Sequence, residues 1–171
     1  MKLTGRNLKQ RLYGLGQLPG RVARARYFRG HGVHSPYVYA IVRHVFMVRE
    51  LTTERRDLYD LLLANGAPRR RAVQLQNLMT HCGYDTFAVN DLPEACLFAI
   101  LTSDLSDDRT LALVEQASRV GATLVLARPY ACRERTEFCR QLIERHRSTS
   151  IDNRGYLIIF NNHLPKQHFK L

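Results

Sequence analysis

The chain of 171 residues contains no long apolar run. A membrane-spanning helix needs about 20 mostly apolar residues in succession, so the sequence predicts none. Residues 1–30 are basic throughout and have no apolar stretch of the kind that marks a secretory signal, so we expect no such signal. Apolar residues make up 45% of the chain and charged residues 24%, which excludes a chain that is disordered throughout. The length predicts one domain, with room for an additional arm.

Cysteine is scarce and shows no pattern of pairs. The four cysteines form no Cys-x-x-Cys motif, and no histidine stands at zinc-finger spacing from two of them, so we expect no metal site. Cys132 and Cys139 fall seven residues apart in a predicted helix, where they share a face and serve packing. Free thiols and the missing signal together predict a cytoplasmic protein.

Acidic residues are nearly absent from the first third of the chain. Residues 1–56 hold 12 Lys or Arg and two acids, a net charge of +10, whereas residues 57–171 hold 14 basic and 13 acidic residues, a net charge of +1. Arg outnumbers Lys 22 to 4, and the planar guanidinium binds phosphate and carboxylate with two parallel hydrogen bonds. The basic segment is either a solvated face or an arm for nucleic acid, an anionic membrane surface, an acidic protein or a second copy of the chain.

The candidate binding residues of this arm are arginines interleaved with aromatic residues. Arginines would contact phosphates, and Tyr27 and Phe28 would stack on bases. Two nearby histidines are candidate bases, although a turn before a helix also favours a role in locking the loop. These candidates are Arg21, Arg24, Arg26, Arg29, His31 and His34.

Helical periodicity and apolar runs alternate along the rest of the chain. Ser35 before Pro36 predicts the capped start of a helix. The predicted helices cover residues 2–13, 36–49, 53–64, 107–120 and 132–147. The predicted strands cover residues 72–75, 86–89, 96–101, 122–127, 149–152 and 156–160, the last two joined by a hairpin turn at residues 153–155.

Strands that alternate with helices predict an α/β fold with a Rossmann-like, mostly parallel sheet. The closing hairpin is expected to add an antiparallel strand at the edge of the sheet. We divide the chain into a basic helical N-terminal arm, residues 1–56, and a Rossmann-like α/β domain, residues 57–171.

Two terminal motifs carry a family resemblance. Residues 31–37 read HGVHSPY, and the C-terminal part reads TSID at 149–152, GYLIIF at 155–160 and KQHF at 166–169. With these motifs the chain resembles a bacterial group of O-methyltransferase-like proteins within the class I S-adenosylmethionine-dependent methyltransferases. The resemblance implies S-adenosylmethionine as cofactor, if the protein is active.

The chain departs from this family where the cofactor would bind. The resemblance implies a glycine-rich turn with an acid after the first strand, but residues 73–83 read VQLQNLMTHCG, with one glycine and no carboxylate. The acidic pair expected after a later strand is replaced by residues 128–130, RPY. The chain is also shorter than a full member of that group, as if a cofactor-binding strand–helix unit were missing. A Cβ where the backbone must approach a ligand blocks that approach.

Polar residues expected after the strands are the candidate small-molecule site, because open α/β sheets bind ligands beyond the carboxyl ends of their strands. If the protein is active, Gln76, Asn77 and Asp91 would contact the cofactor and Asp104 would be the acid nearest the chemistry. The further candidates are Asn90, Thr102, Ser103, Arg128 and Tyr130.

Three functions follow from these observations. The first is a degenerate methyltransferase-like protein without methyl-transfer activity. The second is an active O-methyltransferase with an unorthodox cofactor site, and the third is a module that binds nucleic acid or a partner through the arginine-rich arm. Fold resemblance does not choose among them, because activity depends on the residues of the site.

Overall fold

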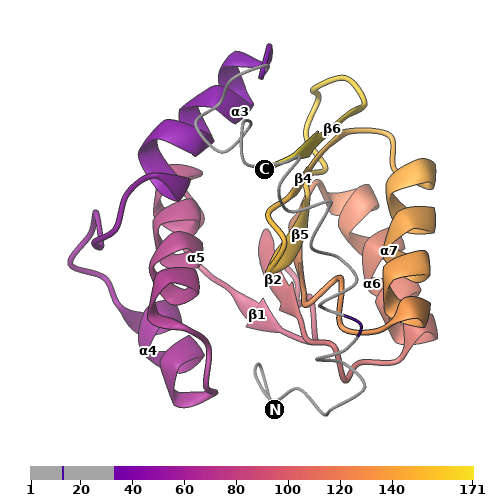
Figure 1. Cartoon of the computed structure of the whole chain (residues 1–171), viewed down its shortest axis with the longest axis horizontal. Coiled ribbons are helices and arrows are strands. Elements are labelled where there is room, and N and C mark those ends of the chain that lie inside the picture. The colour runs from indigo at the N-terminus through magenta and orange to yellow at the C-terminus, as the bar shows by residue number, and fades with distance from the viewer. Residues whose placement is uncertain (1–12, 14–32) are drawn as a thin grey trace.

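The computed structural model of the protein describes residue 13 and residues 33–171. In this part of the chain, helices cover both faces of one six-stranded sheet (Figure 1). The α/β class and the mostly parallel, Rossmann-like sheet predicted from the sequence are confirmed. None of the helices described is both long enough and apolar enough to cross a bilayer.

The sheet contains one reversed strand among parallel ones. Strand β5 runs antiparallel to its neighbours β3 and β4, whereas β1, β2 and β3 are parallel to one another and β6 is parallel to β4. The spatial order is β1-β2-β3-β5-β4-β6. The strands are β1 (Ala88–Val89), β2 (Phe98–Leu101), β3 (Thr123–Ala127), β4 (Thr149–Asp152), β5 (Tyr156–Ile159) and β6 (Gln167–Lys170).

The predicted antiparallel hairpin is confirmed, but the expectation that it adds the edge strand of the sheet is wrong. Strand β5 lies inside the sheet, and all four of its residues are buried, as a strand covered on both faces requires. The edge is formed by β6. Its residues are exposed or only partly buried, which suits an edge strand with a partner on one side, and its His168 Nδ1 lies 2.9 Å from Ser150 Oγ of β4.

One face of the sheet is covered by α3 (Pro36–Ile41), a π-helical turn (Val42–Phe46), α4 (Asp57–Ala64) and α5 (Arg69–His81). The predicted cap is confirmed, since Ser35 Oγ accepts a hydrogen bond from the Val38 amide and Pro36 occupies the first turn. The apolar residues of these elements form one core with side chains from the sheet, among them Phe98, Ile100 and Val125.

The predicted strand at residues 72–75 is wrong, because these residues lie inside helix α5. The helix buries every residue from 72 to 79, including Gln74, Gln76 and Asn77. Four consecutive residues with mixed polarity fit either a strand or a buried helix, and only the longer stretch shows apolar residues at helical spacing. The first parallel strand of the sheet is therefore β1.

The other face is covered by α6 (Asp107–Val120) and α7 (Arg133–Arg145) (Figure 1). Local signals define α6 well: Ser106 caps its first turn, and Gly121 ends it with φ of 77°. Cys139 packs in this second core, as expected, whereas Cys132 instead caps α7 by accepting a hydrogen bond from the Arg135 amide.

Only part of the predicted N-terminal arm lies among the residues that the structure describes. Of the predicted helix 2–13, only Tyr13 is described, and its hydroxyl donates to Thr136 Oγ1 of α7 at 3.1 Å. Val38, Ile41 and Val42 belong to the same core as α4 and α5. The division at residue 56 stays a prediction, although the described apolar core continues across it.

Candidate functional site

The candidate site lies where the parallel strands end. Three residues at this edge of the sheet, Asn90, Arg128 and Arg154, have left-handed backbone conformations with φ of 58°, 52° and 52°. This conformation costs a residue with a side chain about 1–3 kcal/mol, and it persists where the surroundings hold it. Such residues gather at sites that bind ligands, so the carboxyl edge of the sheet is the first place to look for one.

The ends of β1 and β2 are tied together by side chains. Asn90 Nδ2 donates to Thr102 Oγ1 at 2.8 Å, and the Thr102 amide donates to Asn90 Oδ1 at 2.8 Å. Thr102 is fully buried. The bonds join the residue that follows β1 to the residue that follows β2, so the Asn90 side chain fixes the ends of the two strands to each other.

The two predicted acids of the site lie on the surface. Asp91 forms an ion pair with Arg109 of α6 at 3.2 Å, with both side chains more than half exposed. Asp104 is also exposed, and a hydrogen bond from the Thr102 side chain lowers the pKa of its carboxyl group. Both acids therefore face solvent.

The predicted cofactor residues Gln76 and Asn77 hold helices together. Both are fully buried in α5. Gln76 Oε1 accepts a hydrogen bond from the Tyr59 amide of α4 at 3.0 Å. Asn77 accepts one from the Thr52 amide at 3.0 Å and donates one to the Glu50 carbonyl at 2.8 Å. Neither residue follows a strand, because the segment that contains them is a helix.

A pocket opens between the helices α4 and α5 and the end of β3. Its cavity volume is about 50 Å³, and it opens to solvent. Its walls are apolar residues from both helices and from the sheet, and two arginines lie among them. The lining residues are Leu62, Ala67, Pro68, Arg71, Leu75, Ile100, Val125, Ala127, Arg128, Gly155 and Tyr156.

Arg71 is held in place by a polar network. Its Nη1 donates to Gln74 Oε1 and to Asn153 Oδ1, both at 3.0 Å. The Tyr156 hydroxyl donates to Gln74 Oε1 and accepts from Asn153 Nδ2, again at 3.0 Å each. Gln74 Nε2 completes the network by donating to the Phe46 carbonyl. The network joins α5 to the turn between β4 and β5, which is 82 residues away in the sequence.

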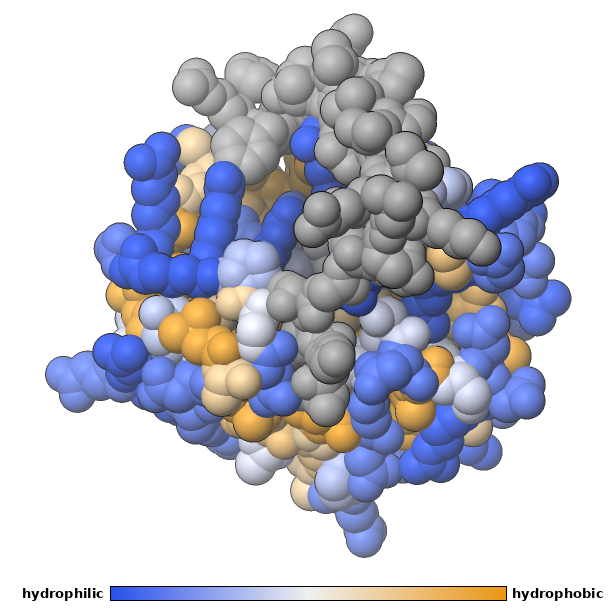
Figure 2. Space-filling model, turned by 60° about the horizontal axis from the view of Figure 1, so that its bottom comes forward, coloured by the Kyte–Doolittle hydropathy of each residue, from blue (hydrophilic) through white to orange (hydrophobic). Residues whose placement is uncertain are grey.

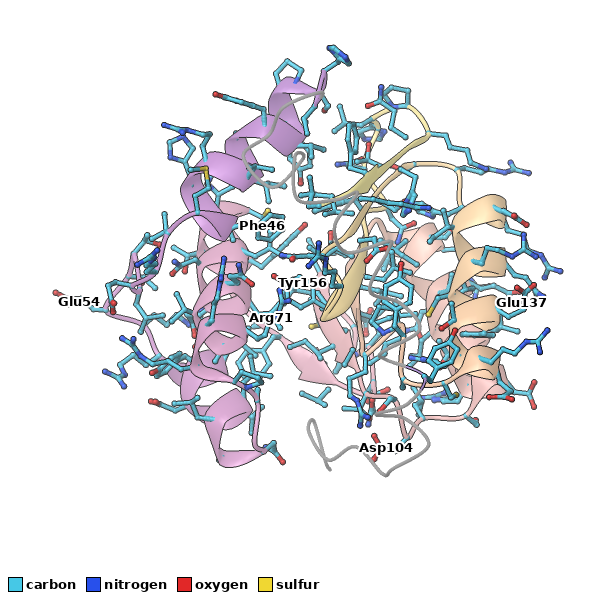
Figure 3. All side chains as sticks on the ribbon, in the orientation of Figure 1. Phe46, Glu54, Arg71, Asp104, Glu137 and Tyr156 are labelled. Carbon is cyan, nitrogen blue, oxygen red and sulfur yellow. The ribbon has the colours of Figure 1, made fainter. Side chains whose placement is uncertain are left out.

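The guanidinium of Arg71 also packs against Tyr156 and Gly155. Its Cζ lies 5.2 Å from the centre of the Tyr156 ring, and Figure 3 shows both side chains between α5 and the sheet. A Cβ on Gly155 would lie 2.6 Å from Arg71 Nε. Burial raises the pKa of the Tyr156 hydroxyl to about 12. Gly155 is thus the residue that lets the guanidinium reach the turn.

Another arginine, Arg135 of α7, lies at this end of the molecule and is buried on the opposite face of the sheet. The Arg135 side chain is 6% exposed, and its nearest acidic partner is Asp107 at 3.6 Å. None of its guanidinium nitrogens has a hydrogen-bond partner within the described residues. Its Cζ lies 5.5 Å from the centre of the Phe138 ring. The charge is therefore buried with little compensation.

The predicted residues of the arm are not brought into this site by the described structure. Arg21, Arg24, Arg26, Arg29 and His31 lie outside the described residues. His34 is described and exposed, directly before the cap of α3.

Sequence reasoning located Arg128 after a strand but missed the residues that define the pocket with it. Arg71 directly precedes residues 72–75, which were interpreted as a strand, and Gly155 and Tyr156 were interpreted as a hairpin turn and a strand only. The run of three arginines at residues 69–71, directly before a buried segment, was the available signal.

In the residues that the structure describes, no three His, Cys, Asp or Glu side chains gather in a way that would hold a metal ion. No family model, no curated protein and no solved structure matches the chain, so the methyltransferase-like relationship stays a resemblance of motifs.

Proposed function

We propose that the protein is a degenerate methyltransferase-like protein that does not transfer methyl groups. The observation that carries the proposal is the pair of hydrogen bonds by which the Asn90 side chain ties the end of β1 to Thr102 at the end of β2. In the family that the terminal motifs resemble, a glycine-rich turn after the first strand lets the backbone approach the cofactor. Here the first parallel strand is followed by residues 90–93, NDLP, without a glycine.

The charges at this edge also support the proposal. S-adenosylmethionine carries a sulfonium and an ammonium group, and its ribose hydroxyls need an acceptor such as a carboxylate. Asp91 and Asp104 are exposed, and Asp91 is paired with Arg109. The described residues that line the apolar pocket nearby include Arg71 and Arg128 and no acid, so they disfavour a cationic cofactor.

Calorimetric titration of the full chain with S-adenosylmethionine and S-adenosylhomocysteine tests the proposal. The expected result is no heat of binding at millimolar ligand. Binding with a Kd near 1 μM, which corresponds to about −8 kcal/mol, would overturn it and favour an active O-methyltransferase. In that case Asp91→Ala would weaken binding if Asp91 holds the ribose, whereas the exposed Glu115→Ala on α6 would not.

A second candidate function rests on the charge of the chain, which is concentrated in residues 1–56. A basic arm of this kind binds nucleic acid, and its affinity falls with salt by a slope of about −0.9 per phosphate contact on duplex DNA. Hydrophilic side chains cover much of the described surface on the face drawn in Figure 2. Replacing Arg24, Arg26 and Arg29 by Ala is expected to abolish such binding. Salt-independent binding, or no change in the triple variant, would exclude the arm as a nucleic-acid site and leave an acidic protein or a second copy of the chain as its partner.

A further inference from the structure

The pocket beside α5 combines apolar walls with positive charge. Leu62, Leu75 and Val125 are buried residues of the first core that also line the pocket. Among the described residues that line it, the charged ones are Arg71 and Arg128. Water binds weakly to such walls, whereas a guanidinium in an apolar setting attracts an anion more strongly than it does in bulk water. This combination suits a ligand with an anionic group and an apolar body.

The start of helix α5 adds to the positive charge at the pocket. The first turn of this helix carries Arg69, Arg70 and Arg71 and no acid, and its N-cap residue Pro68 provides no side-chain hydrogen bond. The N-terminus of a helix has a partial positive charge, so acids stabilise it and arginines do not. Arg69 is paired with Glu50 at 2.6 Å, but Pro68 and Arg71 both line the pocket, which places the start of the helix at its wall.

The guanidinium of Arg71 is also pre-organised. It is held by Gln74, Asn153 and the Tyr156 ring, and Gly155 leaves room for it. A side chain that is already fixed loses little conformational freedom when a ligand binds. Arginine further favours carboxylate and phosphate because its planar fork forms two parallel hydrogen bonds with them.

We propose that this pocket binds a small organic anion, with its carboxylate or phosphate against Arg71 and Arg128 and its apolar body against the side chains of α4, α5 and β3. The inference is independent of the proposed function. It concerns a ligand that is an anion, and it holds or fails whatever the titration with S-adenosylmethionine shows.

The first experiment compares ligands that share one chain length. Binding of hexanoate, hexyl phosphate, hexanol and hexylammonium to the full chain is measured by calorimetry, with inorganic phosphate as an anion that has no apolar body. We expect hexanoate or hexyl phosphate to bind at least tenfold more tightly than the other three. The stronger of the two anions tells which head group the site prefers. Equal affinity for hexanol and the two anions, or binding of neither anion, would overturn the proposal.

Variants separate the pocket from a general effect of positive charge. Arg71→Met is expected to weaken binding of the preferred anion at least tenfold, whereas Arg119→Met, which removes an exposed charge at the end of α6, leaves it unchanged. Gly155→Ala keeps every charge but forces Arg71 to move, and a similar loss is expected. Equal losses in Arg71→Met and Arg119→Met would assign binding to net charge and overturn the proposal.

Two further variants keep the test decisive if Arg71→Met does not fold. Arg128→Gly removes the second guanidinium and suits the backbone at that position, where φ is 52°. Ala67→Phe fills the pocket from the connection between α4 and α5. Each is expected to weaken anion binding at least tenfold, and wild-type affinity in both would place the anion elsewhere and overturn the proposal.

Discussion

The two helical layers of the molecule are built differently. The layer of α6 and α7 rests on an apolar core in which Leu113, Ala117 and Cys139 face the sheet. The layer of α3, α4 and α5 also buries apolar residues, but α5 places Gln74, Gln76 and Asn77 inside the protein as well. Apolar packing is non-directional, whereas each buried amide needs a partner in the right place. The layer of α6 and α7 is therefore expected to tolerate polar substitutions at its surface. The layer of α3, α4 and α5 depends on specific hydrogen-bond partners that are distant in the sequence.

The largest effect is expected from a cavity in the apolar layer. Leu113 on α6 is fully buried. Replacing it by Ala removes apolar contacts and leaves a space, which costs about 3 kcal/mol of the free energy of unfolding. Chemical denaturation of both proteins measures the difference. Val120→Ala, at a position that is 54% exposed on the same helix, is the matched control. A similar loss of stability in both variants would contradict the interpretation that buried apolar packing holds this layer to the sheet.

The next effect concerns the tyrosine of the polar layer. Burial raises the pKa of Tyr156 to about 12, so between pH 10 and pH 12 the unfolded chain loses this proton and the folded chain keeps it. The free energy of unfolding is therefore expected to fall with rising pH in this window, by about 2–3 kcal/mol from this group. Denaturation at pH 9 to 12 measures the slope.

Two variants test whether the Tyr156 hydroxyl causes this dependence of stability on pH. Tyr156→Phe is expected to be less stable at neutral pH but to lose less stability between pH 10 and pH 12. Tyr39→Phe, on a ring that is 46% exposed, is expected to keep the wild-type slope. An unchanged slope in Tyr156→Phe would show that this hydroxyl is not the group responsible.

Removal of Gln74 tests the network directly. Gln74→Met keeps the side-chain volume but leaves the Phe46 carbonyl without this donor and the Tyr156 hydroxyl without its acceptor. We expect a loss of about 2 kcal/mol, since an unsatisfied buried polar group costs about 1–3 kcal/mol. The double variant with Tyr156→Phe is expected to lose less than the sum of the two single changes. Gln141→Met, on the exposed face of α7, is the control, and additive losses would argue against a shared network.

The smallest effect is expected at Arg135, the buried charge of the apolar layer. Arg135→Met removes a guanidinium without hydrogen-bond partners in the described residues and leaves Asp107, whose side chain is 57% exposed, to be solvated by water. Because a charged group is poorly solvated in an apolar core, the change is expected to leave stability unaltered or raise it by about 1 kcal/mol. A large destabilisation would show that this layer, like the other, depends on a specific polar partner.

The same contrast explains what sequence reasoning achieved. Helix α6 was predicted with its observed bounds because Ser106, Gly121 and an apolar stripe are signals within one short segment. Strands β2 and β3 were recognised as continuous apolar runs for the same reason. Helix α5 was missed because Gln74, Gln76 and Asn77 interrupt its apolar pattern, and their partners at Phe46, Tyr59 and Glu50 are distant in the sequence.

The site was only partly accessible to such reasoning. Arg128 was placed after a strand because the apolar residues 122–127 end there. That it lines the same pocket as Arg71 depends on the packing of α5 against the sheet. The requirement for Gly155 has no local signal beyond a turn, because the atoms that a Cβ would meet belong to Arg71. Asp91 and Asp104 lie in the loops after β1 and β2, as the sequence predicts, but only the structure shows that both are exposed.

The sequence by itself determined the α/β class, most of the strands and helices, the absence of a long apolar segment and the concentration of positive charge in residues 1–56, because composition, periodicity and caps act over short distances. Only the tertiary structure decided that β5 enters the sheet between β3 and β4, that α5 is a helix with buried amides, and that Arg71 meets the turn at Gly155. These features depend on contacts between residues far apart in the chain, and their free energy appears only when the layers come together.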